Sequence, residues 1–192
     1  MMKIIMIVFF AVFLMGCSTD DSLLEINPNN ENEDTVGHWQ DDTLEYVQGE
    51  VGFGLKDSVT LLELANYIYS LEDIYINEVV SFQYYTRLPQ DSMQIIKSVL
   101  ESKSYIWDGM VYVSYIEADS PILIEFWIKD FKSGDRQNWI ATKERFELIH
   151  VPYNFQLGLL KVEIGKEKEW IDKLIQVNLF RFVELNYITH TC

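Results

Sequence analysis

The chain has 192 residues, with 15 Lys or Arg against 30 Asp or Glu, so its formal net charge at pH 7 is −15. A protein this acidic is repelled by phosphate backbones and anionic lipid head groups, which excludes nucleic acid and a charge-attracted membrane surface as partners. The stretch from Leu44 to Ile188 has no low-complexity run, and it is long enough for one domain or two small ones packed together.

The N-terminus has the layout of a secretory signal peptide. Lys3 precedes an almost purely apolar run, Ile4–Met15, and a small residue, Gly16, stands before Cys17. The run is about 12 residues long, whereas a membrane-spanning helix needs about 20, so a permanent transmembrane anchor is the weaker interpretation. We expect residues 1–16 to be the signal peptide.

The sequence Leu14-Met15-Gly16-Cys17 resembles the lipobox of bacterial lipoproteins. The resemblance implies that Cys17 is lipidated and becomes the first residue of a mature lipoprotein of the cell envelope, held in the outer membrane by its lipid. An ordinary signal peptide followed by an incidental cysteine is the alternative. The pair Asp20-Asp21 resembles the surface-export signal of Bacteroidetes lipoproteins, but a solvated linker would carry aspartates as well, so surface and periplasmic orientations both stay open.

Residues 17–43 are rich in Asn, Asp and Glu and poor in apolar side chains. Such a composition cannot offset the entropy of ordering, so we expect a flexible acidic tether. The chain has two cysteines, and lipidation would use Cys17, so Cys192 is left without an intramolecular partner. A disulfide framework is therefore excluded.

Residues 44–118 predict the order strand, helix, strand, strand, helix, strand. Thr60 and Glu63 form a capping box at the first helix, and Asp91 is expected to cap the second. The predicted strands are Tyr46–Leu55, Ile74–Val80, Phe82–Leu88 and Met110–Tyr115. The expected buried stripes of the two helices are Leu61, Leu64, Ala65 and Ile68, then Met93, Ile96, Val99 and Leu100.

The same order restarts in residues 119–192. The predicted strands are Ile122–Ile128, Leu148–Val151, Leu157–Ile164 and Phe180–Ile188, and the predicted helices are Trp139–Phe146 and one that carries Trp170, Ile171, Leu174 and Ile175 on one face. The sequence thus predicts an α+β fold of two ferredoxin-like βαββαβ units in tandem, with helices packed on mainly antiparallel sheets. Coincidental α+β patterning is the alternative to a duplication.

The residue pattern does not favour an enzyme, a metal site or a cofactor. The histidines, His38, His150 and His190, have no helical metal-ligand spacing, and no cysteine cluster exists for zinc. Gly52-Phe53-Gly54 begins like a dinucleotide loop, but Asp57 stands where the third glycine would fall. We expect small residues of a strand there instead. Glu167 and Glu169 lie near a helix start, where they favour the dipole without chemistry.

Three segments resemble the propeptides of subtilisin-type proteases, a family that also includes free-standing inhibitors. The segments are Val51–Thr60, Leu159–Ile171 and Phe182–Ile188, the last containing Phe182-Val183-Glu184-Leu185-Asn186 where the family has a Tyr-Ala-Glu-Pro-Asn-like signature. Together they cover about a sixth of the chain. Leu185 in place of the usual proline, and the occurrence of the ferredoxin-like unit twice, are departures from the family's pattern.

The resemblance implies that the chain inhibits or chaperones a secreted subtilisin-type serine protease. Its tail would lie in the protease cleft by strand addition, while the sheet face docks beside it. The contact residues would be Glu184, Leu185, Asn186, Tyr187, Ile188 and Thr189. Fold does not dictate function, so the first expectation is broader: an envelope-anchored, non-catalytic binding module of unknown ligand, with the protease inhibitor as the alternative.

Overall fold

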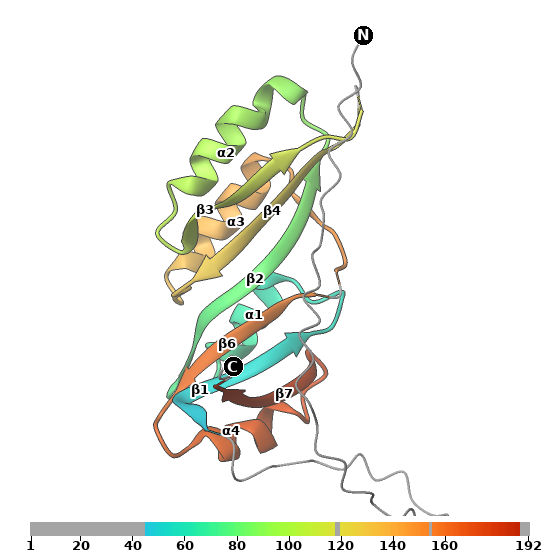
Figure 1. The fold of residues 1–192 in the computed structure, drawn as a ribbon. Coiled ribbons are helices and arrows are strands. Elements are labelled where there is room, and N and C mark those ends of the chain that lie inside the picture. Colours follow the sequence, from blue (N-terminus) through green and yellow to red (C-terminus); the bar gives the residue numbers. More distant parts are fainter. Residues whose placement is uncertain (1–44, 118–119, 154, 189–192) are drawn as a thin grey trace, which may run out of the picture. The chain divides into compact units, whose positions relative to one another are not determined.

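The computed structural model describes residues 45–117, 120–153 and 155–188, all of which belong to the C-terminal unit that begins at Asp41. Tyr46–Leu55 (β1), Ile74–Thr86 (β2), Ile106–Ser114 (β3), Ile122–Lys129 (β4), Ile149–His150 (β5), Leu157–Val162 (β6) and Phe180–Tyr187 (β7) form one antiparallel sheet (Figure 1). The helices of this part of the chain are Leu61–Ile68 (α1), Met93–Glu101 (α2), Asp135–Arg145 (α3) and Glu167–Leu174 (α4), with a short 3₁₀ turn at Gln90–Ser92 (η1). The expected α+β class is confirmed.

The expected tandem order of the two units is not confirmed. The strands lie in the order β3-β4-β2-β6-β1-β7, with β5 also paired to β2. The strands β2-β6-β1-β7 with α1 and α4 form one βαββαβ unit, and β3-β4-β2-β5 with α2 and α3 form a second. The second unit is therefore inserted into the first, and both share the long strand β2.

Strand β2 can serve both units because a bulge divides it. Ser81, with φ of +61°, lies where the register against β4 shifts between Val79 and Phe82. The segment before the bulge pairs with β6 and, at Glu78 and Val79, also with the end of β4, whereas the segment after it pairs with β4 and β5. The two strands predicted on either side of Ser81 are thus one bent strand.

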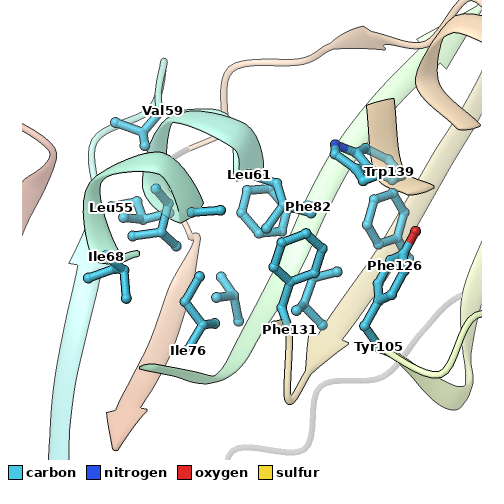
Figure 2. Packing of buried hydrophobic residues seen from close by; sticks show 14 of the residues in the cluster. Leu55, Val59, Leu61, Ile68, Ile76, Phe82, Tyr105, Phe126, Phe131 and Trp139 are labelled. Carbon is cyan, nitrogen blue, oxygen red and sulfur yellow. The ribbon is translucent and has the colours of Figure 1, made fainter. Parts of the chain in front are cut away.

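One continuous core joins the two units. Alternate residues of each strand are buried against the helices, as Val51, Phe53 and Leu55 are in β1. Figure 2 shows Phe82 and Phe131 between Ile76 of the first unit and Trp139 of the second. Figure 1 shows the four described helices on one side of the sheet. In the described part of the chain no helix covers the opposite side, which we call the helix-free face.

The capping box at α1 is confirmed, since Thr60 Oγ1 accepts from Glu63 N–H and the Glu63 carboxylate accepts from Thr60 N–H. Asp91 was predicted to cap the second helix, and this prediction is wrong. Helix α2 starts at Met93 after η1, and no side chain caps it. The expected stripe of α4 is also shorter than predicted, because Ile175 is exposed beyond its end.

Glu167 anchors α4 to β1 and has a structural role. It is 2% exposed, and its Oε1 accepts a hydrogen bond of 2.6 Å from the N–H of Gly49, which has φ of +74°. Burial raises the pKa of Glu167, but hydrogen bonds from the backbone of Gly49, Glu167 and Gly165 outweigh it, so the pKa lies below 4.5. The charged form is therefore the one that the fold stabilises.

We expect Glu167→Gln to lower the free energy of unfolding at pH 7 by about 1.5 to 3 kcal/mol, because a charged hydrogen bond to Gly49 is lost. The folded-state pKa is depressed, so this stabilisation is present above the unfolded pKa and is lost as the pH falls through the folded pKa. Urea titrations between pH 7 and pH 3 should show the wild type and the variant converging. The exposed Glu169→Gln is the control, and an equal effect of both changes would contradict the assignment.

Candidate functional site

The helix-free face of the second unit carries two rows of side chains across three strands. Directly paired residues share a face, so Tyr112 of β3, Glu125 of β4 and Gln83 of β2 form one row. Ser114, Leu123 and Tyr85 form the next row, which Ile149 of β5 extends. The paired residues on the opposite side, such as Phe126 and Phe82, are buried in the core. The rows are therefore the solvent side of an otherwise well-packed sheet.

Glu125 is fixed in the middle of the first row by its neighbours. Ser81 Oγ donates to Glu125 Oε1 at 3.0 Å, and Gln83 Nε2 donates to Oε2 at 3.1 Å. Among the described residues, no lysine or arginine lies within ion-pair distance of this carboxylate. Glu125 is thus a pre-oriented, uncompensated hydrogen-bond acceptor on an open surface.

A hollow of about 280 Å³ lies over these rows. Gln83, Tyr112, Ser114, Leu123, Glu125 and Val151 contribute to its lining. Tyr112 is 55% exposed. Trp107 on the same strand is 39% exposed, with the ammonium of Lys129 5.7 Å from its ring, but it does not line the hollow. The hollow therefore combines one exposed aromatic side chain with polar groups, a combination found in small-molecule sites.

The same face in the first unit carries a compact polar network. Glu50 of β1 is 9% exposed, forms an ion pair with Lys161 of β6 and accepts a 2.7 Å hydrogen bond from Asn186 Nδ2 of β7. Burial, and then the nearby charge of Glu50, raise the pKa of Glu78. The partners of Glu50 are mutually satisfied, so this network ties three strands together.

Most residues of the expected protease-contact tail lie within the sheet. Glu184, Leu185, Asn186 and Tyr187 belong to β7 and pair with β1, and Leu185 is buried. Ile188 N–H still bonds Glu45 O at 2.8 Å. Thr189 lies outside the described residues. The alternation of Phe180–Ile188 predicted this strand, and contact of these residues with a protease stays a prediction.

His150 is the singled-out histidine that lies within the described residues. His150 packs edge-on against Tyr84, 5.4 Å between ring centroids, and hydrogen-bonds Gln156 at 3.3 Å. Burial lowers its pKa, which keeps it neutral at pH 7. Cys17, His38, His190 and Cys192 lie outside the described residues. In the part of the chain that is described, no group of three His, Cys, Asp or Glu is placed to hold a metal ion.

The helix-free face was not predicted from the sequence, although the alternation that marks it is present there. Alternation in Met110–Tyr115 and Ile122–Ile128 separates two faces, and Tyr112 and Glu125 fall on the faces opposite Val111 and Phe126. What the pattern could not give was the pairing that places them side by side.

No described helix is long and apolar enough to span a membrane. Comparison with known protein families, curated proteins and solved structures finds no match.

Proposed function

We propose that the protein is an envelope-anchored lipoprotein whose C-terminal domain is a non-catalytic binding module, and that the helix-free face of its second unit is the recognition surface. The observation that carries this proposal is the hydrogen-bonded Glu125, set beside exposed Tyr112 and Leu123 in the hollow over three strands. An exposed aromatic side chain there adds little to the stability of the domain, whereas such side chains are enriched at binding surfaces. The lipobox-like sequence at Cys17 supports the anchoring.

Cys17→Ala should abolish incorporation of a fatty-acid analogue and release the protein from the membrane fraction. One lipidated residue supplies the whole mature anchor, and the acidic chain has no charge attraction to lipid. Metabolic labelling and fractionation measure both effects, with Cys192→Ala as the matched control that should behave as wild type. Labelling of Cys17→Ala equal to that of wild type would contradict the proposal.

The recognition surface can be tested without knowing the ligand. A thiol-reactive label measures how accessible a cysteine is at position 112, in Tyr112→Cys, with and without a whole-envelope extract from the source cells. Ile95→Cys, on the helix side of the sheet, is the control. Both parent residues are exposed. Protection of position 112 alone supports a binding face, whereas equal access of both sites in every extract contradicts it.

A second candidate function is inhibition or chaperoning of a subtilisin-type protease. One specific observation favours it: the three segments that resemble the protease propeptides form β1, β6 with α4, and β7, all in the first ferredoxin-like unit. There β1 lies between β6 and β7, and β7 ends the sheet. An edge strand has free backbone groups for strand addition, which is the contact that inhibition requires.

If this candidate is correct, the purified domain should slow a secreted subtilisin-type protease of the same organism. Deleting residues 189–192 should weaken inhibition while leaving the melting curve unchanged, because those residues lie beyond the last strand. A deletion from Glu184 is unsuitable, because it removes buried Leu185 and the Asn186 bond to Glu50. Steady-state protease kinetics measures the effect, and equal inhibition by both forms would exclude a tail-dependent mechanism.

A further inference from the structure

The hollow on the second unit has a chemical character that narrows the ligand class. Each polar side chain around it can accept a hydrogen bond: the two carboxylate oxygens of Glu125, the amide oxygen of Gln83 and the hydroxyls of Ser114 and Tyr112. Glu125 Oε1 and Oε2 each receive one donor, from Ser81 and Gln83, and a carboxylate oxygen can accept more than one. A ligand that fits must therefore be rich in donors.

Flat apolar surface adjoins these acceptors. Tyr112 lies beside Glu125 in the same row, and Leu123 lies beside Tyr85 in the next. The face of an aromatic ring attracts the weakly positive hydrogens of C–H groups. A ligand with hydroxyl groups around its edge and C–H groups on its faces satisfies both features, and a sugar ring has that construction.

Charge separates this ligand class from the alternatives. The uncompensated Glu125 and a net charge of −15 oppose anionic ligands such as nucleotides or acidic polymers. A basic peptide would be attracted by Glu125, but a single exposed carboxylate offers it only one ion pair, which contributes little. A neutral ligand carries no charge of its own, so it needs no charged partner in the hollow.

We propose that the hollow lined by Gln83, Tyr112, Ser114, Leu123 and Glu125 binds a neutral oligosaccharide, with Tyr112 stacking on a sugar ring and Glu125 accepting its hydroxyls. The inference rests on the proposed binding function and names its ligand class. The part of β2 that follows the bulge, Phe82–Thr86, is about 16 Å long at 3.3 Å per residue, which accommodates a short oligosaccharide.

The test uses the full chain and affinity gel electrophoresis through gels that contain a neutral polysaccharide: a β-glucan, a starch, a mannan, a xylan or a galactan. We expect retardation by at least one of them. Tyr112→Ala should weaken that binding about tenfold through lost stacking, and Glu125→Gln should weaken it several-fold. Phe155→Ala is the matched control, because Phe155 is 60% exposed and does not line the hollow.

Salt dependence supplies the second readout. Binding of a neutral sugar should be nearly unchanged between 0.05 and 0.5 M salt, about a 3-fold change in Debye length, whereas a basic peptide should be lost. No retardation in any gel overturns the proposal, and so does retardation that Tyr112→Ala and Glu125→Gln leave unchanged. If position 112 is nevertheless protected by envelope extract, the binding function stands and only the sugar assignment fails. If it is not protected, both fail.

Discussion

Trp139→Ala should lower the free energy of unfolding by about 3 to 5 kcal/mol, the usual cost of truncating a buried tryptophan. Trp139 is 0% exposed, and its ring centroid lies 5.3 Å from that of Tyr84 and 5.2 Å from that of Phe126. Of the residues of α3, only Trp139 and Thr142 are buried, so this one ring supplies most of the attachment of α3 to the sheet. Urea denaturation followed by circular dichroism measures the effect.

Trp107→Ala is the matched control for this prediction. Trp107 is partly exposed on β3, and its described interaction is with the ammonium of Lys129, which is worth about 0.5 to 1 kcal/mol at an exposed site. The two tryptophan substitutions should therefore differ by about 2 kcal/mol or more. Equal destabilisation would contradict the placement of α3 on the core side.

Local structure could be predicted because its causes are local. The strand over Tyr46–Leu55 is confirmed as β1, and the Thr60–Glu63 box starts α1 as expected. Gly52 and Gly54 lie within β1 as small strand residues, and a Cβ at Gly54 would clash with the ring of Phe182. Each of these features depends either on residues close in sequence or on the alternation of buried and exposed side chains along a strand. That alternation is the same whichever strands lie beside it.

Strand pairing could not be predicted, because periodicity says which side of a strand is buried but not which strand lies beside it. Neighbouring strands in a chain often pair, and this favoured a tandem arrangement. Here β6 lies between β1 and β2, and β4 lies between β2 and β3. Moving the sequence pattern by about 75 residues superposes the two predicted halves and takes Ile96 to Ile171, which also indicated a tandem repeat. In the fold these residues belong to α2 and α4, the first helix of one unit and the second helix of the other.

The candidate site depends on the same non-local information. Glu125 accepts hydrogen bonds from Ser81 and Gln83, which precede it by 44 and 42 residues in the chain. No sequence motif joins these positions. Glu167 is a second example, because it lies in the first turn of α4 as expected but also accepts a hydrogen bond from Gly49, 118 residues away. Acidic side chains that look interchangeable on an acidic chain thus have distinct roles once the strands are paired.

Neither of the fragments 44–118 and 119–192 should fold alone. The first contains β1, β2 and β3, and the second contains β4, β5, β6 and β7. Every strand pair in the described sheet joins one fragment to the other. The pairs are β1 with β6 and β7, β2 with β4, β5 and β6, and β3 with β4. Each fragment would expose its apolar strand faces without a single native strand partner.

The fragments should instead recover structure when mixed in equal amounts, because all the native pairs then become available between two chains. The matched control is the fragment 74–151, of similar length, which keeps β2, β3, β4 and β5 together with α2 and α3. Thermal melting by circular dichroism should show a cooperative transition for the mixture and for 74–151, and none for either separate half. A cooperative transition of 44–118 by itself would contradict the observed strand order and support two successive units. Such a transition requires β1, β2 and β3 to pair with one another.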